Sequence, residues 1–451
     1  MVTHDKAKQD SGRGAPDPSA LRAMLREFDS SRVRMWLDIC SGCGLCAESC
    51  FYYLSGDRDP KLSPAYKARS TFGEMVRKKG KATRAFMERC YETAFFKCTG
   101  CKRCSQFCPF GIDIASMMFF VRSLCHSQGI PESGLTVLSE NHRKTGNHSG
   151  ISKEEFIDTC QWIEEETRDE IRGAELPIDK ENARYVYTLN PREIVFQPQE
   201  VGLAAKILTL AGESWTLPSR GWDCTNLPMF MGDRKLAGET VREVYDAARR
   251  LKAEKVLLTE CGHAYRSLVF EGPYLAGYPD GRPPVEIVHS VQLFYEYLKD
   301  GRIRIDPAKR FKEPVTYQDP CGISRNGGLW KTARKIIPYL ADDFREMSPS
   351  KDYNHCCGGG AGLIPMGASH KAKRMASGRF KAGQIRKTGA GIVITSCHNC
   401  FDQVSDLSEE YGLGVKAFLF KEALDHMLLI PDALKPHAGP AETSPGETGA
   451  A

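Results

Sequence analysis

Cysteine is the residue type in this chain with the most chemistry to offer. Eight of the 18 cysteines form two runs with the same spacing, Cys-x2-Cys-x2-Cys-x3-Cys. This spacing is typical of a loop that places three thiolates around one [4Fe-4S] cubane and gives the fourth to a neighbouring cubane. It predicts two cubanes and an electron-transfer protein. The first run consists of Cys40, Cys43, Cys46 and Cys50, and the second of Cys98, Cys101, Cys104 and Cys108.

The pattern also predicts how the two runs share their ligands. The last cysteine of each run is exchanged, so that each loop completes the cluster of the other. We expect one cubane on Cys40, Cys43, Cys46 and Cys108, and the other on Cys98, Cys101, Cys104 and Cys50.

Two other interpretations of these runs are zinc knuckles and disulfides. Zinc sites usually combine two close cysteines with two ligands well downstream, unlike four cysteines in eleven residues occurring twice. Disulfides are disfavoured because the polar N-terminus has no apolar core of a signal peptide, which predicts a reducing compartment. One position departs from the cubane pattern: Pro109 follows the second run, but Phe51 follows the first.

A third group of cysteines is spread along the C-terminal part of the chain. Two of its members are adjacent and are followed by three glycines, which allow the backbone to approach a metal closely. Five thiolates exceed the four of a cubane and suit an opened cluster, with one bridging thiolate and one iron able to accept an outside sulfur. A structural zinc site on four of them is the alternative. The five are Cys321, Cys356, Cys357, Cys397 and Cys400.

The elements around these cysteines differ between the two parts of the chain. Residues 31–130 have helical periodicity, and the 47 residues between the two runs favour inserted helices. A helix is expected over 153–171. After residue 190, strand signals alternate with helix signals, which predicts open α/β lobes. Strands are expected at 193–196, 255–259, 314–318 and 391–395, and helices at 238–253 and 369–386.

The two α/β lobes resemble an internal repeat. Residues 258–264 align with 394–400, which pairs Cys261 with Cys397, and residues 196–200 align with 317–321. The first lobe keeps two of the five cysteine positions, Cys224 and Cys261. The other three are replaced by Glu200, Thr225 and Ala264. We therefore expect a complete second lobe that holds a cluster beyond its strand ends, and a degenerate first lobe that covers it.

The fold class predicted is α+β and multidomain, with a helical ferredoxin-like two-cluster domain followed by two α/β lobes. The expected domains are a disordered or helical extension (1–30), the ferredoxin domain (31–130), a connector (131–190), the degenerate lobe (191–313), the complete lobe (314–430) and a disordered tail (431–451).

The second lobe carries a family resemblance. The spacing Cys321-x34-Cys356-Cys357-Gly358 with Cys397-x2-Cys400 resembles the CCG domain of heterodisulfide reductases. With the two-cubane domain, the chain resembles their D-type subunit and the DsrK, TmcB and HmcF subunits of sulfate-reducing bacteria. The resemblance implies a noncubane [4Fe-4S] cluster on the five cysteines. It also implies a cytoplasm-facing, peripheral subunit of a membrane redox complex, with a cytochrome b or quinone-reactive partner.

Two functions compete on this sequence. The first is a heterodisulfide reductase-like thiol-disulfide oxidoreductase that acts on a small disulfide or on a protein disulfide or trisulfide. Its protons would come from His263, His355 and His398, which flank aligned cluster positions. The second is a relay between a membrane cytochrome and another carrier or a flavin dehydrogenase. A zinc-stabilised scaffold is a third, nonenzymatic option.

Charge and hydropathy limit the partners. The formal net charge is +5, and residues 61–103 hold twelve Lys or Arg against three acids. This stretch is either a solvated face or a docking surface for an acidic partner. It contains no recognisable nucleic-acid-binding module, so nucleic acid is not expected as a partner. The longest apolar stretches are shorter than a spanning helix, so any membrane attachment would come through a partner.

Overall fold

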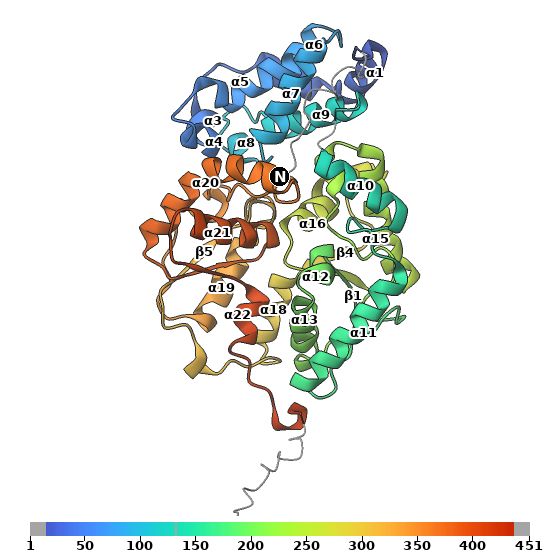
Figure 1. Ribbon diagram of the computed structural model, residues 1–451, viewed down its shortest axis with the longest axis vertical. Coiled ribbons are helices and arrows are strands. Elements are labelled where there is room, and N and C mark those ends of the chain that lie inside the picture. Colours follow the sequence, from blue (N-terminus) through green and yellow to red (C-terminus); the bar gives the residue numbers. More distant parts are fainter. Residues whose placement is uncertain (1–14, 131–132, 437–451) are drawn as a thin grey trace, which may run out of the picture.

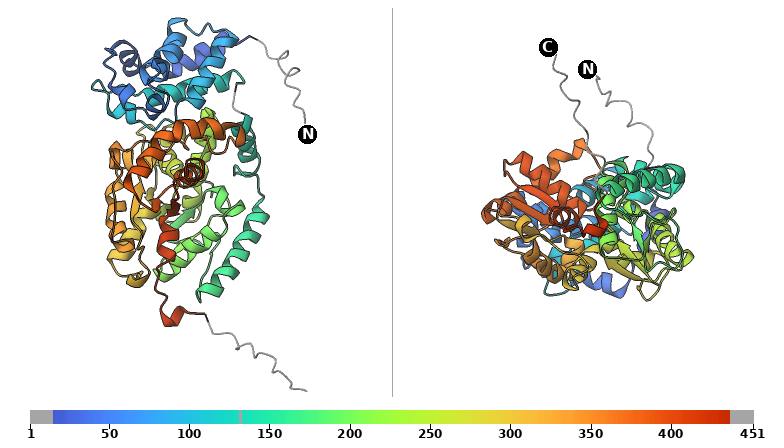
Figure 2. Two further views of the ribbon diagram at one scale, coloured as in Figure 1. Left: turned by 60° about the vertical axis from the view of Figure 1, so that its left-hand side comes forward. Right: turned by 90° about the horizontal axis from the view of Figure 1, so that it is seen from below.

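The computed structural model describes residues 15–130 and 133–436 as a helical domain stacked on two α/β lobes (Figure 1). The helical domain, coloured blue, sits over the junction of the two lobes. The first lobe is green to yellow and the second orange to red, and the two lie side by side in both Figure 1 and Figure 2. None of the helices within the described ranges is long and apolar enough to cross a membrane.

The N-terminal domain is built from short helices, as its sequence predicts. The aromatic and methionine side chains of these helices form one core that includes Phe72, Phe86, Phe95 and Met117. The segment between the two cysteine runs is helical throughout most of its length, which confirms the prediction of inserted helices. The helices are α1 (Pro18–Phe28), α2 (Ser31–Asp38), α3 (Leu45–Glu48), α4 (Phe51–Ser55), η1 (Pro60–Leu62), α5 (Pro64–Ala68), η2 (Arg69–Gly73), α6 (Glu74–Arg77), α7 (Arg84–Phe96), α8 (Arg103–Gln106) and α9 (Ile114–Ser127).

The first lobe has a parallel sheet with the strand order β2-β1-β3-β4. Parallel strands with helices on both faces are buried, and β1 is buried along its whole length. The strands are β1 (Tyr185–Thr188), β2 (Trp215–Thr216), β3 (Lys255–Leu258) and β4 (Glu286–His289). The helices are α12 (Pro191–Val195), α13 (Gln199–Leu210), α14 (Leu227–Met231), α15 (Arg234–Arg250), α16 (Gly262–Arg266), η3 (Ser267–Glu271), α17 (Gly272–Leu275) and α18 (Ser290–Lys299).

The second lobe repeats this arrangement with the order β5-β6-β7. An isolated parallel bridge between Val315 and Phe344 stands where β2 pairs with β1 in the first lobe. The elements are η4 (Pro307–Lys309), β5 (Val315–Gln318), η5 (Cys321–Arg325), α19 (Trp330–Leu340), η6 (Lys351–Tyr353), α20 (Ala368–Thr388), β6 (Ile392–Thr395), α21 (His398–Glu410), β7 (Lys416–Leu419), α22 (Phe420–Asp425) and η7 (Asp432–Leu434).

Most predicted elements are confirmed, but the strand expected at 193–196 is wrong. Residues 193–195 lie in α12 and Phe196 is its C-cap, and the start of this helix is fixed by a capping box between Asn190 and Glu193. The first strand of this lobe is β1 instead. It ends before residue 191, where the degenerate lobe is expected to begin, and so lies inside the expected connector. The sequence does not predict this four-residue strand, because Tyr185–Thr188 carries no alternation of polar and apolar residues.

The remaining described part of the 131–190 segment, from residue 133 onward, is an outer layer on the first lobe. It contains α10 (Ser133–Thr145) and α11 (Lys153–Glu170), which matches the helix expected over 153–171. The chain end expected to be disordered from residue 431 begins with η7, where the Leu434 carbonyl accepts the Arg172 N–H at 2.8 Å. The other residues expected to be disordered, 1–14 and 437–451, lie outside the described ranges.

The buried imidazole of His142 links α10 to two carboxylates of the first lobe. His142 Nδ1 lies 3.3 Å from Asp223 Oδ2, and its Nε2 lies 3.0 Å from Glu243 Oε2. Burial alone would lower the pKa of His142, but its hydrogen bonds to Asp223 and Glu243 outweigh burial and raise the pKa from 6.5 to about 9. His142 is therefore protonated at neutral pH.

This raised pKa predicts a pH-dependent stability. The contribution of His142 is fully present below its unfolded pKa of 6.5 and is lost as the pH rises through 9. We expect the free energy of unfolding to fall by about 3 kcal/mol across that window. His142→Gln should flatten the curve of stability against pH between these values, as measured by denaturant titration. Equal slopes for the wild type and the variant would contradict the assignment.

Candidate functional site

The first cysteine set gathers around an open cavity of about 370 Å³. Its wall contains Cys40, Cys43 and Cys46, together with Cys108 from the second run. Burial and the nearby thiols of Cys40, Cys108 and Cys43 raise the pKa of Cys46. Cys43 is exposed to solvent. The loop needs its glycines here, because Gly42 and Gly44 have φ of 74° and 84°.

The second set contains Cys98, Cys101, Cys104 and, from the first run, Cys50. Burial and the thiols of Cys101, Cys98 and Cys50 raise the pKa of Cys104 well above its ordinary value. The Gly100 N–H donates to Cys98 Sγ at 3.3 Å. The structure thus brings the last cysteine of each run beside the first three of the other run. This is the crossed grouping that the spacing predicts.

The third set is closed and mostly buried. Cys400 Sγ lies 3.2 Å from Cys357 Sγ, and Cys356 is hydrogen-bonded to both Cys357 and Cys321. Hydrogen bonds from Cys356 and Cys400 hold the pKa of Cys357 well below its ordinary value. A hydrogen bond with Cys400 lowers the pKa of Cys397 to about 7. The five thiols therefore form one connected group. Within it, Cys357 and Cys397 have the lowered pKa of thiolates, the form that binds metals, whereas neighbouring thiols raise the pKa of Cys356 and Cys400 well above its ordinary value.

Backbone and side-chain donors point at this third group. The N–H groups of Gly358 and Gly359 lie 3.4 Å from Cys356 Sγ and Cys357 Sγ. The Gly262 N–H of the first lobe donates to Cys397 Sγ at 3.3 Å. A Cβ at Gly322 would lie 2.3 Å from the Gly262 carbonyl oxygen, so the two lobes can meet here only through glycine. Such donors stabilise thiolate ligands and tune the metal that they hold.

The second and third sets touch each other. Thr99 Oγ1 donates to Cys356 Sγ at 3.5 Å, and the thiols of Cys101 and Cys356 lie close enough to shift each other's pKa. Arg325 donates to the Cys101 carbonyl at 2.8 Å and also to the Asn354 carbonyl. The helical domain and the second lobe therefore meet through their ligand loops.

Several buried cations near these two sets have no acidic partner among the residues that the structure describes. Arg122 is 1% exposed and donates to the carbonyl oxygens of Ala94, Cys98, Phe230 and Ala361. Lys67 Nζ lies 3.8 Å from Cys50 Sγ and donates to the Lys97 carbonyl. Lys381 Nζ donates to Asn354 Oδ1 at 2.8 Å.

The charge of these cations shows whether the second and third cysteine sets fit a negatively charged group. Throughout residues 15–130 and 133–436, none of Lys67, Arg103, Arg122 and Lys381 has a carboxylate within ion-pair distance. A buried charge without a counter-charge is strongly unfavourable. Thiolate-ligated clusters carry the negative charge that would balance them, so the residues present fit iron–sulfur clusters at both places.

Strand ends position the third set. β5 ends at Gln318 and β6 at Thr395, and these two residues are paired in the sheet. Cys321 begins η5 and Cys397 caps the N-terminus of α21, so both follow directly from the carboxyl edge of the sheet. The Gln318 amide reaches back to Cys400 Sγ at 3.9 Å.

The counterpart of Cys321 in the first lobe is Arg192, and the expected alignment with Glu200 is wrong. Asn190-Pro191-Arg192 follows β1 as Asp319-Pro320-Cys321 follows β5, with one extra residue in the first lobe. Cys261 remains the counterpart of Cys397, because each caps the helix that follows the paired strand. Cys224 is buried and donates to the Leu189 carbonyl at 3.1 Å.

Two of the three histidines expected to move protons are buried bases with low pKa. Burial, followed by the charges of Arg266 and Arg122, lowers the pKa of His263 to about 3. Burial and the charge of Arg103 lower that of His355 to about 2. His263 Nε2 accepts the Ala361 N–H at 2.9 Å and so supports the glycine-rich loop. Neutral imidazoles at these positions do not favour proton donation.

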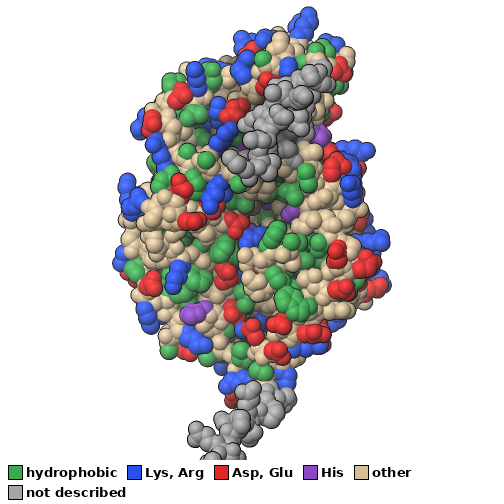
Figure 3. Space-filling model, viewed as in Figure 1, with side chains coloured by type: hydrophobic (Ala, Val, Ile, Leu, Met, Phe, Trp, Pro, Cys, Tyr) green, Lys and Arg blue, Asp and Glu red, His purple; other side chains and the backbone are tan. Residues whose placement is uncertain are grey.

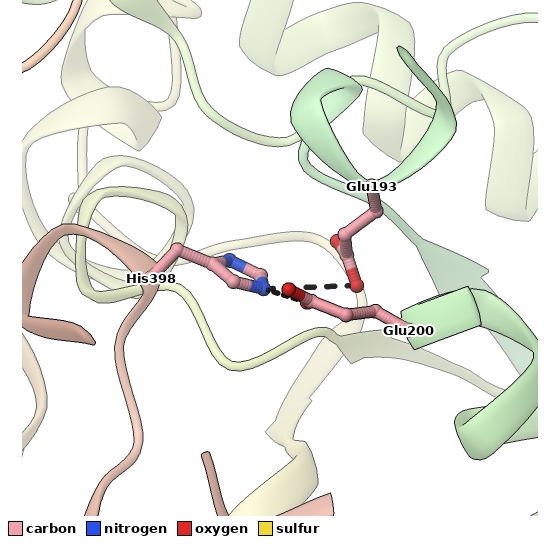
Figure 4. Close-up of side chains that lie close together, drawn as sticks. All are labelled: Glu193, Glu200 and His398. Atoms are coloured by element: carbon pink, nitrogen blue, oxygen red, sulfur yellow. Dashed lines mark hydrogen bonds and ion pairs between the residues drawn. The ribbon is translucent and has the colours of Figure 1, made fainter. Parts of the chain in front are cut away.

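The third histidine, His398, belongs to a buried ionic cluster between the lobes (Figure 4). Its Nε2 lies 2.8 Å from Glu200 Oε2, and Glu193 lies beside it. Three such ligands could hold a metal ion. However, Lys421 Nζ lies 2.6 Å from Glu193 and 2.8 Å from Glu200, so an ammonium group already supplies the positive charge.

Two domain-family models match parts of this chain. The family model of the 4Fe-4S dicluster domain matches residues 36–112, and that of the CCG cysteine-rich domain matches residues 315–405. The first covers both cysteine runs, and the second covers the five cysteines of the third set.

Curated relatives match most of the chain at low identity. The Hdr-like menaquinol oxidoreductase iron-sulfur subunit 2 of Archaeoglobus fulgidus is 25% identical, over 84% of this chain and 77% of that protein. The D-type subunit of the dihydromethanophenazine:CoB–CoM heterodisulfide reductase of Methanosarcina barkeri is also 25% identical, over 82% and 89%. The EtfAB:quinone oxidoreductase of Syntrophomonas wolfei is 22% identical, over 84% and 55%. The chain is therefore an iron–sulfur protein that transports electrons as a subunit of an oxidoreductase.

Proposed function

We propose that this chain, a CCG iron–sulfur protein of the heterodisulfide reductase D type, is the disulfide-reducing subunit of a membrane-associated redox complex. Electrons would pass from the first cysteine set through the second to the third, where a disulfide or trisulfide is reduced or formed. The observation that carries this proposal is the contact between the ligand loops of the second and third sets, where Thr99 Oγ1 donates to Cys356 Sγ at 3.5 Å and Arg325 donates to the Cys101 carbonyl at 2.8 Å.

The proposal assigns a cluster to each cysteine set. Two cubane [4Fe-4S] clusters would be held by the crossed sets, and one noncubane [4Fe-4S] cluster by Cys321, Cys356, Cys357, Cys397 and Cys400. When bound, these groups supply one-electron carriers and, at the third site, an iron that can accept a sulfur atom. The overall reaction is R–S–S–R′ + 2 e⁻ + 2 H⁺ → R–SH + R′–SH. The S–S bond breaks, and the electrons come from a one-electron donor on a partner subunit.

Lys381 is the proton donor that the sequence did not reveal. It is buried in α20, and burial lowers its pKa to about 8 against the raising effect of nearby Cys357 and Cys356. Its Nζ is held by Asn354 Oδ1 and lies 3.6 Å from Met347 Sδ. An ammonium group with this pKa can release a proton near neutral pH. No sequence motif marks it, because it is one of several lysines along a long helix.

The exposed end of the path is the place for the electron partner. Cys43 is exposed, and large hydrophobic side chains near the first set are also unusually exposed, among them Ile39, Leu45, Tyr66 and Phe110. A quinone-reactive or cytochrome b subunit could dock here and hold the chain at the inner face of the membrane. Exposed apolar groups beside a redox centre are typical of such contacts.

An electron relay without disulfide chemistry is the second candidate. The burial of four of the five thiols in the third set, each no more than 4% exposed, favours it. In that case the third set would be an intermediate station between a quinone-linked partner and a soluble carrier or flavin dehydrogenase.

The test combines metal analysis with EPR spectroscopy of anaerobically purified protein in the oxidised state. Oxidised cubanes are EPR-silent, so a signal in this state that changes on addition of an organic disulfide supports the reductase. A full complement of iron and sulfide without any disulfide-dependent signal favours the relay. Zinc in the third set would contradict both candidates.

Arg122 gives a prediction for the second cluster. A buried positive charge stabilises the reduced state, which is more negative by one charge. Arg122→Met should therefore lower the reduction potential of that cluster by roughly 50–100 mV, from a unit charge in a medium of effective dielectric constant near 20. Arg122→Lys keeps the charge and is the matched control in an EPR-monitored redox titration. Equal shifts in both variants would assign the effect to packing.

A further inference from the structure

A groove of about 360 Å³ lies on the helical domain between α1, α2, η2 and α6. Its floor is apolar and continuous with the core of the domain, to which Phe28 and Phe72 belong. Val76 also lines it and is 38% exposed. The apolar lining consists of Leu25, Phe28, Val33, Leu37, Phe72 and Val76. An apolar surface that stays open on a folded domain is typical of a contact with a membrane or with another chain.

The polar lining of this groove is mostly cationic. It comprises four basic side chains and one carboxylate, that of Asp29, which already pairs with Arg34 at 2.5 Å. The other three cations, Arg22, Arg26 and Lys79, are exposed and have no carboxylate within ion-pair distance among the residues described. We call these three the cationic rim. The groove therefore combines an apolar floor with an excess of three positive charges.

The structure shows which cations of the basic stretch 61–103 contribute to this charge. Two of the twelve are buried, five pair with carboxylates and one donates to the Cys40 carbonyl. Without such a partner among the residues described are Lys61, Arg77, Lys79 and Lys81. A Cβ at Gly80 would lie 3.1 Å from Arg22 Cγ, so the loop that carries Lys79 and Lys81 packs on α1. The uncompensated cations of the stretch thus meet those of α1 at the groove.

The composition of α2 favours a membrane surface as the occupant. Met35 is 45% exposed and lies beside Arg34, which is also exposed. Trp36 follows and is partly exposed. Basic, aromatic and large apolar side chains presented together to solvent are typical of helices that lie at a lipid interface. In Figure 3, Lys and Arg side chains project at the top of the molecule, where Figure 1 shows α6 and α1.

The groove is continuous with the face proposed for the electron partner. α2 ends at Asp38, the exposed Ile39 follows, and Cys40 begins the first cysteine set. Leu37 of the same helix lines the groove. If a membrane subunit docks at the first set, the lipids around that subunit would meet α2 and the cationic rim.

We propose that the groove and its cationic rim bind anionic phospholipids, with headgroup phosphates at Arg22, Arg26 and Lys79 and an acyl chain on the apolar floor. An anionic amphiphile is the occupant that complements both the charge and the apolar floor. The orientation rests on the proposed function, in which a partner subunit holds the chain at the membrane. Lipid binding itself needs neither that partner nor a disulfide.

The test is co-sedimentation of the anaerobic holoprotein with protein-free vesicles. We expect binding to phosphatidylcholine vesicles that contain phosphatidylglycerol, and at least tenfold weaker binding to phosphatidylcholine alone. Each cation near an anionic surface contributes about fivefold, so Lys79→Gln with Lys81→Gln should weaken binding about 20-fold. Val76→Ser should weaken it about threefold, because it removes apolar surface from the groove.

The matched control is Lys309→Gln with Lys312→Gln. These two lysines are exposed and lie in the second lobe, so the pair changes the net charge equally and should leave vesicle binding unchanged. Equal losses in both double variants, or unchanged binding in Val76→Ser, would overturn the groove as the lipid site. Unchanged iron content and circular dichroism show that each variant is folded.

The remaining outcomes separate the lipid surface from other partners and from the reductase. Binding to membranes of the native cells but not to protein-free vesicles would assign the rim to an acidic protein partner and overturn the proposal. Vesicle binding without a disulfide-dependent EPR signal supports the lipid surface and contradicts the reductase. That EPR signal without vesicle binding overturns the lipid surface and leaves the reductase standing.

Discussion

Cys357→Ala is expected to remove the third cluster and to lower disulfide reduction by at least about 100-fold. Even changes outside the ligand set of a metal cost about 10–100-fold, and Cys357 is the thiol with the most strongly lowered pKa of its group. Its Sγ is linked to both Cys356 and Cys400, so its loss opens the group at its centre. Iron, sulfide and turnover are measured on the same preparation.

The matched control for this variant is Cys160→Ala. Cys160 is as buried as Cys357 but lies in α11 at the outer side of the first lobe, in an apolar setting. It should keep its full iron content and its turnover. Retention of the third cluster in Cys357→Ala would exclude Cys357 as a ligand, and equal losses in both variants would point to a general effect of replacing a buried thiol.

Lys421→Met is expected to destabilise the protein by about 3–5 kcal/mol. The ammonium group of Lys421 is buried between Glu193 and Glu200, and removing one partner of a buried ion cluster leaves uncompensated charge. Two carboxylates and His398 would remain close together in the contact between the two lobes. Denaturant titration of the anaerobic holoprotein measures the loss in unfolding free energy.

The control for this prediction is a lysine in a solvent-exposed ion pair. Lys252 Nζ lies 2.5 Å from Glu181, and both side chains are more than half exposed. Lys252→Met should have little effect, because surface ion pairs contribute little to stability. Similar losses in the two variants would contradict the buried-cluster account. Recovery of Lys421→Met by added zinc would show that Glu193, Glu200 and His398 can hold a metal once the ammonium is gone.

Together, the two variants distinguish the parts of the molecule. In the proposed function Cys357 holds the third cluster, so its loss should affect clusters and turnover more than folding. Lys421 belongs to the lobe contact, so its loss should affect stability first. A single core runs through both lobes, from Tyr185 of β1 to Leu424 of α22, so loosening their contact affects both.

The cysteine chemistry could be predicted from the order of residues alone, because ligand spacing is local. Cys-x2-Cys-x2-Cys-x3-Cys lies within eleven residues, and the glycines that such loops need stand beside the cysteines. The strands β3, β5 and β6 were also predictable, since each is a short stretch with strand-favouring residues that is followed within three residues by a cysteine. These features depend on neighbours in sequence, which the chain order gives directly.

The groups that face the sites from distant parts of the chain could be identified only after folding. Alignment of the repeat by sequence pairs Glu200 with Cys321, whereas the short, fully buried strand β1 assigns that position to Arg192. Burial lowers the pKa of His263 and His355, and the spacing of residues in the sequence does not reveal burial. The buried cations Arg122 and Lys381, which have no carboxylate within ion-pair distance among the residues described, become apparent only in the folded chain, because desolvation is a property of the surroundings and not of the residue.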